Sequence, residues 1–155
     1  MKKEYEERVA KAVDYFMQGY GCCQSVVCAF SDLYGLDLTM SKRIAAGFGG
    51  DVGRMRMMCG AVSGIVILVG LDCGQTEGSD REGKSACYKV VQQLLSRSIE
   101  DNGSLICAEL LGIKGPVPLG NYVASERTKE YYKLRPCAAK VESAARIFAE
   151  YLSEK

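Results

Sequence analysis

A stretch rich in glycine, residues 47–64, constrains this chain more than any other. It holds six glycines and one cysteine, Cys59, and an apolar run to Leu71 follows it. Glycine tolerates backbone angles and close approaches that other residues resist, so residues 47–53 predict a shaped loop. The apolar run predicts a helix that begins near residues 57–59.

Two glycines, Gly60 and Gly64, lie four residues apart in the first turns of that predicted helix. Each interior glycine costs a helix about 1 kcal/mol relative to alanine, so a helix that keeps two of them needs a close neighbour. Tight packing between helices through small residues explains the pair. A functional site around Cys59 explains it as well, and the sequence leaves both explanations open.

The length and composition bound the class of protein. The 155 residues predict one domain over residues 1–155, and 48% apolar with 25% charged residues is typical of a globular chain. A net charge of +1 without a dense basic patch argues against a nucleic-acid partner. The start of the chain has no apolar signal core, and the run 61–71 is shorter than the ~20 residues that span a bilayer. We therefore expect a cytoplasmic protein that does not contact a membrane.

Apolar residues recur at helical spacing along most of the chain, and strand-like alternation does not appear. The pattern predicts an all-α, bundle-like single compact domain of about six to eight helices. The expected helices cover residues 3–18, 22–34, 42–48, 57–71, 80–100, 104–111, 125–134 and 137–152. Residues 112–120, rich in glycine and proline, predict the one clear loop. At least five helices have apolar faces, which fits a homodimer and fits burial within one domain equally well.

Eight cysteines and no histidine narrow the chemistry. A reducing cytosol disfavours structural disulfides, so eight cysteines indicate metal binding, redox chemistry or packing in the apolar core. The lack of histidine excludes Cys–His catalysis, mixed Cys/His zinc sites and histidine-ligated haem. Thiolates, carboxylates or non-protein ligands would have to hold any metal.

Position divides the cysteines into two groups. Four lie near the predicted starts of helices: Cys22, Cys59, Cys107 and Cys137. Unpaired N–H groups and the helix dipole stabilise negative charge there, so a thiolate should form more easily. A nucleophile, a redox thiol and a metal ligand all require a thiolate. The other four are predicted to pack as small hydrophobes: Cys23, Cys28, Cys73 and Cys87.

Several motifs together resemble a known family. They are GYGCCQSV at 19–26, the glycine stretch ending in CGAVSG at 59–64, Cys107 before ELLG, and Cys137 before Val141. The combination, over about residues 15–145, is similar to the four-cysteine "putative redox-active proteins" labelled C_GCAxxG_C_C. This resemblance implies that the four helix-start cysteines are the shared set. Cys59 precedes Gly60 here, whereas the label writes glycine before cysteine, and Cys23 stands where alanine is expected.

The four cysteines support a redox function in two forms. Four thiolates from four helix ends can hold an iron–sulfur cluster or a single thiolate-bound metal, as in an electron-transfer site. Without metal, the same four can form two disulfides that cycle with a redox partner protein or a small thiol. No Cys-x-x-Cys pair is present, so neither a thioredoxin-type couple nor a zinc ribbon is supported. The sequence does not decide whether the chain is an enzyme.

The alternative is a small-anion or organic-ligand binding module whose cysteines are structural. Gly47-x-Gly49-x-x-x-Gly53 resembles a dinucleotide loop, but such a loop follows a strand, and residues 42–46 predict a helix. The candidate ligand-binding residues of this module are Gly49, Gly50, Gly53 and Arg54, with Arg56 beside them. Asp51 is interpreted as a turn former. A third hypothesis is an interaction protein whose partner surface includes Tyr122, Tyr131 and Tyr132.

Overall fold

The computed structural model describes residues 1–113 and 119–155, and this part of the chain is built from helices without a strand. The α-helices are α1 (Lys3–Met17), α2 (Cys22–Cys28), α3 (Leu38–Ala46), α4 (Gly60–Cys73), α5 (Arg81–Asn102), α6 (Cys107–Leu111), α7 (Lys129–Leu134) and α8 (Cys137–Ser153), and η1 (Ser31–Tyr34) is a 3₁₀ helix. The all-α, bundle-like prediction is confirmed. None of the described helices is long and apolar enough to cross a bilayer.

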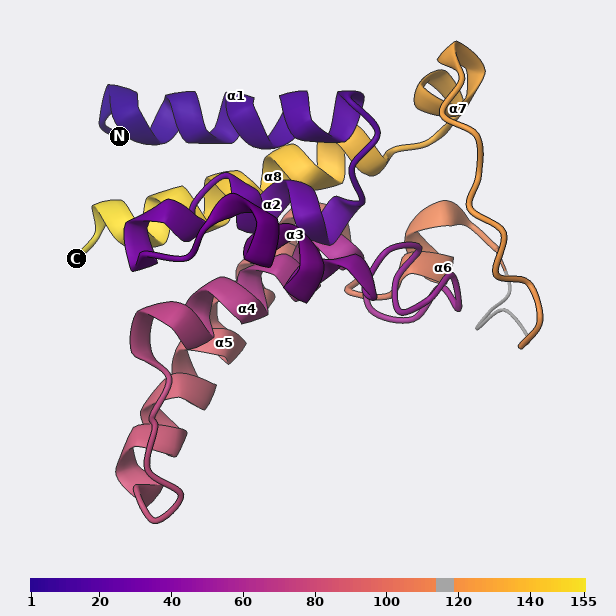
Figure 1. The fold of residues 1–155 in the computed structure, drawn as a ribbon. Helices are drawn as coiled ribbons and strands as arrows, with labels where there is room; N and C mark the ends of the chain where they lie inside the picture. The colour runs from indigo at the N-terminus through magenta and orange to yellow at the C-terminus, as the bar shows by residue number, and fades with distance from the viewer. Residues whose placement is uncertain (114–118) are drawn as a thin grey trace.

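Helix α4 lies at the centre of the fold. Its first ten residues are buried almost without interruption, and it packs against α2, α5 and α8. Helices α1 and α8 run antiparallel along one side, while α4 and α5 form a pair that extends away from them (Figure 1). The short helices α6 and α7 lie at the end of the molecule opposite the two chain termini (Figure 1). A helix that is apolar all round belongs in a core, which is where α4 lies.

Two glycines of α4, Gly60 and Gly64, admit helix α2 at very short range. A methyl group on Gly64 would lie 2.8 Å from Val26 Cβ, and one on Gly60 would lie 3.2 Å from Cys22 Cβ and 2.7 Å from Asp51 Oδ1. The close neighbour expected from the sequence is therefore confirmed. Gly64 meets a packing residue, Val26, while Gly60 meets Cys22 and Asp51, which lie beside Cys59 in the cavity described below.

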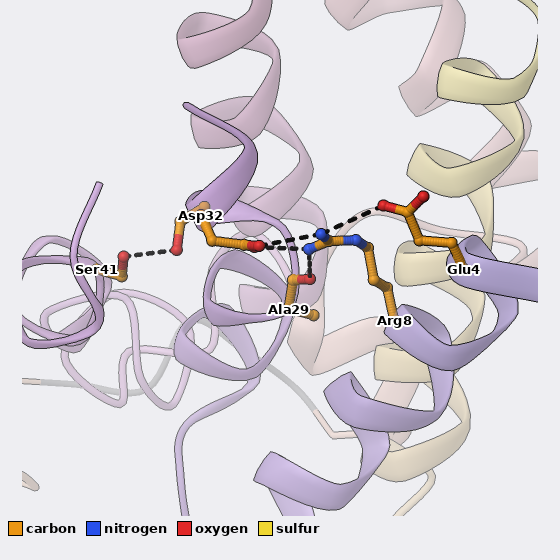
Figure 2. Close-up of polar contacts among 6 residues, drawn as sticks. Glu4, Arg8, Ala29, Asp32 and Ser41 are labelled. Atoms are coloured by element: carbon orange, nitrogen blue, oxygen red, sulfur yellow. Dashed lines mark hydrogen bonds and ion pairs between the residues drawn. The ribbon is translucent and has the colours of Figure 1, made fainter. Parts of the chain in front are cut away.

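The predicted helix over residues 22–34 is wrong in its second half, because α2 ends at Cys28 and η1 follows. Arg8 of α1 stabilises the break. Its guanidinium donates to the Ala29 carbonyl at 2.9 Å and to the two oxygens of Asp32 at 2.6 and 3.0 Å (Figure 2). The carbonyl freed where the helix ends is thereby paired, as a buried backbone group must be.

Capping residues explain the other shifted boundaries. Helix α3 begins before its predicted start because the Asp37 carboxylate accepts from the Met40 N–H at 2.8 Å. Helix α6 begins later, at Cys107, since Ser104 Oγ accepts from the Ile106 N–H instead of capping a helix. Helix α7 also begins later than predicted, after the Thr128 cap. Of the predicted loop 112–120, residues 114–118 lie outside the described residues.

The contact between α2 and α4 can be tested by adding a methyl group to Gly64. We expect Gly64→Ala to lower the free energy of unfolding by about 1–3 kcal/mol, the usual cost of overpacking. Gly70→Ala in the same helix is the matched control, because a methyl there meets nothing within 4 Å. The control should raise the free energy of unfolding by up to about 1 kcal/mol through helix propensity. Urea denaturation measures both, and equal effects would contradict the packing argument.

The ion pair between Arg8 and Asp32 predicts a pH dependence of stability. The hydrogen bonds from Arg8 lower the pKa of Asp32, so the pair stabilises the fold above the unfolded pKa of about 4 and ceases to do so as pH falls through the folded pKa. Asp32→Asn should lower the free energy of unfolding at neutral pH by at most ~1 kcal/mol, because the carboxylate is largely exposed. The difference from the unsubstituted protein should vanish in acid. Glu7→Gln is the control, because Glu7 and Lys3 are both mostly exposed.

Candidate functional site

The four cysteines at helix starts surround one small cavity. Cys22, Cys107 and Cys137 are the first residues of α2, α6 and α8, and Cys59 is the N-cap of α4. Together with Asp51 they line a cavity of ≈ 10 Å³. That volume is about the space that one water needs, so the side chains around it lie nearly in contact. The structure therefore brings all four predicted cysteines together.

Backbone contacts hold these helix starts in place. The Cys59 N–H donates to the Leu105 carbonyl at 2.7 Å, and the Cys107 N–H donates to the Met57 carbonyl at 2.6 Å. These bonds flank an isolated bridge between Met58 and Ile106, which joins the segment before α4 to the segment before α6. The site is consequently built from short pieces that are distant in sequence and meet at one end of the bundle (Figure 1).

The glycine stretch forms a loop with an uncommon left-handed backbone. Five consecutive residues, 50–54, have φ values between 56° and 66°, and only two of the five are glycine. Left-handed geometry costs an L-residue roughly 1–2 kcal/mol, so the surroundings must hold Asp51, Val52 and Arg54 there. Arg54 contributes, since its guanidinium donates to Asn121 Oδ1 at 2.9 Å and to the Val123 carbonyl.

Asp51 is a site residue that the sequence analysis missed. Asp51 lies in a turn, as interpreted from the sequence, but its side chain is also buried and lines the cysteine cavity. Its Oδ1 accepts from the Gly60 N–H at the start of α4, and the Cys107 thiol donates to the carboxylate. Burial raises the pKa of Asp51, although these two hydrogen bonds and the charge of Arg56 oppose that rise. An acidic residue inside a glycine-rich loop was the only available signal.

Cys22 and Cys137 form a hydrogen-bonded pair of thiol and thiolate. The Cys22 thiol donates to the Cys137 sulfur, and this bond is the largest cause that lowers the pKa of Cys137 to about 7. The guanidinium groups of Arg135 and Arg56 lower it further, against burial and the charge of Asp51. The same hydrogen bond, with burial, holds the pKa of Cys22 well above its ordinary value. The two shifts favour a thiolate on Cys137 and a proton on Cys22.

The prediction that all four helix starts favour a thiolate is wrong for the other three cysteines. Burial raises the pKa of Cys59 to about 11, with a contribution from the charge of Asp51, although N–H groups in the first turn of α4 lower it. Burial and the hydrogen bond to Asp51 raise the pKa of Cys107. The helix N-terminus thus acts as expected, and desolvation outweighs it.

The remaining four cysteines lie away from this cavity. Cys23 and Cys28 are buried in α2, at 0% and 4% exposure. Cys73 at the end of α4 and Cys87 in α5 are half-buried and hydrogen bond to each other, a contact that the sequence did not predict. All eight cysteines are free thiols.

As arranged here, the thiols do not form a metal site. Within residues 1–113 and 119–155, no group of three or more Cys, Asp or Glu side chains has an arrangement that can hold a metal ion. The cavity among the four cysteines also leaves no space for the atoms of an iron–sulfur cluster. Metal binding by these thiols would require them to rearrange.

The predicted ligand-binding residues line a second and larger cavity beside the cysteines. Gly49, Gly50, Gly53 and Arg54 all contribute to this cavity of ≈ 380 Å³, together with Arg56 and Arg127. A neighbouring cavity of ≈ 330 Å³ shares Arg54 and Arg56 and extends to Arg135 and Pro136, directly before Cys137. The sequence analysis named neither Arg127 nor Arg135. The position of Arg135 two residues before a site cysteine was the signal for it.

A model of a known protein family, described as "Putative redox-active protein (C_GCAxxG_C_C)", matches residues 20–151. The chain belongs to this family. The matched range contains all four cysteines of the cavity, and the match confirms the resemblance seen in the sequence. No curated protein and no solved structure matches the chain. C_GCAxxG_C_C membership supports a redox-active role, and the geometry of the four thiols is the basis for proposing its chemistry.

The thiolate character of Cys137 can be measured through its alkylation rate. Iodoacetamide should modify Cys137 with a pH midpoint of about 7. Cys22→Ala removes the hydrogen-bond donor and should shift the midpoint upward, whereas Cys22→Ser keeps a donor and should shift it less. Peptide mass spectrometry follows the modification of Cys137 alone. An unchanged midpoint in Cys22→Ala would show that Cys22 does not stabilise the thiolate.

Proposed function

We propose that this C_GCAxxG_C_C protein performs dithiol–disulfide exchange with Cys22 and Cys137 as its reactive pair. The observation that carries the proposal is that Cys22 and Cys137 line the same small cavity, where each shifts the pKa of the other in the opposite direction. A thiolate next to a protonated thiol is the arrangement that an attacking and a resolving cysteine require. Cys22 and Cys137 are both half-buried, whereas Cys59 and Cys107 are buried, so this pair is the more accessible half of the site.

The exchange proceeds in two steps. The Cys137 thiolate attacks one sulfur of an external disulfide, whose S–S bond breaks, and one thiolate leaves while a mixed disulfide forms on Cys137. Cys22 then releases its proton to solvent and attacks the Cys137 sulfur, so that the second external thiolate leaves. The protein loses two electrons and the one proton that Cys22 carried, and the external disulfide gains the two electrons and leaves as two thiolates, which take up protons from solvent. With excess thiol the same steps run in reverse.

The other residues of the cavity set the energetics of this exchange. The buried Asp51 carboxylate opposes ionisation of every thiol near it, whereas Arg56 and Arg135 favour the Cys137 thiolate. Asp51 and the arginines therefore select one cysteine of the four as the nucleophile. Cys59 and Cys107 stay protonated at neutral pH. If the four cysteines form two disulfides, Cys59 and Cys107 are the second pair.

The test is to oxidise the reduced protein mildly and to locate the disulfide. We expect a bond between Cys22 and Cys137, loss of two free thiols per bond, and loss of this bond in Cys22→Ala and Cys137→Ala. Cys28→Ala on the same helix as Cys22 is the control and should leave the bond intact. Non-reducing peptide mass spectrometry and thiol titration measure these outcomes.

Two results would overturn the proposal. A bond between Cys73 and Cys87 alone would place the reactive thiols at the contact between α4 and α5 instead. The second result is a bound metal. If protein purified without oxygen contains iron with sulfide, or another metal, and Cys137→Ala loses it, the four cysteines bind a metal and do not perform disulfide exchange. The same preparation serves for both measurements, so the two forms are compared on one sample.

A further inference from the structure

Arg56 is a buried cation without an anionic partner. The residue is only 8% exposed and follows the left-handed loop. Among the described residues its guanidinium forms no ion pair and no hydrogen bond to an oxygen or nitrogen. Its polar contact is the thiol of Cys107, a weak acceptor. The charge of Arg56 lowers the pKa of Asp51, but the two side chains form no ion pair. The Asp51 carboxylate is already hydrogen-bonded to Gly60 and Cys107. A mostly buried guanidinium that lines open cavities and has no ion pair is suited to bind an added anion.

The space in front of Arg56 is positively charged. Arg56 lines both of the cavities described beside the cysteine site, of ≈ 330 and ≈ 380 Å³. Arg54 also lines both, while Arg135 contributes to the first and Arg127 to the second, and no described aspartate or glutamate lines either one. Among the described residues, Arg54 and Arg127 donate only to neutral oxygens, so no described carboxylate cancels their charges. The whole chain has a net charge of only +1, which makes four such arginines a local concentration of charge.

The shape of these cavities suits a small molecule. Volumes of a few hundred Å³ are typical of ligand pockets, and the first cavity adds apolar side chains, Leu110, Leu111 and Leu134, to its arginines. An anionic molecule with a short methylene chain matches that combination. Arg135 and Pro136 form the wall that leads directly to Cys137, so a ligand held there lies beside the start of α8.

We propose that the arginine-lined cavities bind the external disulfide or thiol, and that this substrate is a small molecule with carboxylate groups. The proposal rests on the exchange function given above. Arg56 and Arg54 hold one carboxylate, and Arg135 orients the molecule so that its sulfur meets Cys137. Arginine is suited to this role because its planar fork binds a carboxylate through two parallel hydrogen bonds.

Three disulfides of similar length and different charge test the proposal: 3,3′-dithiodipropionate (anionic), 2-hydroxyethyl disulfide (neutral) and cystamine (cationic). The Cys22–Cys137 bond should form fastest with the anionic probe and slowest with cystamine. A thiolate without the arginine-lined cavities would attract the cationic probe and react fastest with cystamine. The order of rates expected here is therefore the reverse of the order that the thiolate charge alone would give. Suberate, the dicarboxylate in which two methylenes replace the disulfide, should bind saturably and inhibit the anionic probe selectively.

The variants separate binding from reactivity. Arg56→Gln changes the reactivity of Cys137 toward all three probes, so the readout is the ratio of the anionic to the neutral rate. We expect this ratio to fall about 10-fold or more, the usual effect of losing a hydrogen bond to a charged group. Arg135→Gln, in the lining of the same cavity, should lower it as well and serves if Arg56→Gln does not fold. Arg43→Gln, an exposed arginine of α3, is the control and should leave the ratio unchanged.

The failures are distinguishable. Bond formation without preference for the anionic probe, or an unchanged ratio in both arginine variants, overturns the substrate assignment and leaves the exchange function standing. No bond with any probe overturns the exchange function and the substrate assignment together. If no probe forms the bond but suberate binds saturably, only the anion site is supported. If suberate does not bind either, the anion site is overturned as well.

Discussion

The close approach of α2 to α4 is the contact on which the rest of this structure depends. Gly60 and Gly64 leave no side chain between the two helices, so Cys22 and Val26 lie directly against the α4 backbone. The same approach brings the start of α2 to the start of α4, where Cys59 and the loop carboxylate of Asp51 lie. A methyl group at either glycine would separate the helices. The packing of the core and the assembly of the cysteine site are thus one structural requirement.

Within the site, burial and charge act in opposite directions on chemically identical groups. Four thiols at four helix starts would be equivalent if only the helix dipole mattered. Desolvation raises the pKa of Cys59 and Cys107, and the carboxylate of Asp51 adds to it. Cys137 alone combines a thiol donor with two guanidinium groups, and its pKa falls to about 7. The four cysteines therefore differ in pKa because their neighbouring groups differ, and family membership by itself does not specify those neighbours.

The left-handed loop joins the two parts of the site. Its backbone directs Asp51 toward the thiols, while Arg54 and Arg56 line the larger cavities. Three L-residues are held in a costly conformation there, and Arg54 secures the loop through Asn121 and Ser125. Strained backbone is common where a side chain must be placed against local preference. One short segment thereby sets both the charge around the cysteines and the charge of the adjoining space.

The sequence by itself determined the helical class, the special role of the glycine stretch, and the four cysteines at helix starts. These follow from local patterns: apolar spacing, glycine where a close neighbour is needed, and cysteine after Gly21 or Pro136. Only the tertiary structure decided that α2 ends at Cys28, that Asp51 is buried, and that Cys137 is the acidic thiol. Each of these depends on partners distant in sequence, such as Arg8 for Ala29 and Cys22 for Cys137. A pKa or a helix break that is set by such contacts has no local signature, because the desolvation and charge that produce it exist only after the chain has folded.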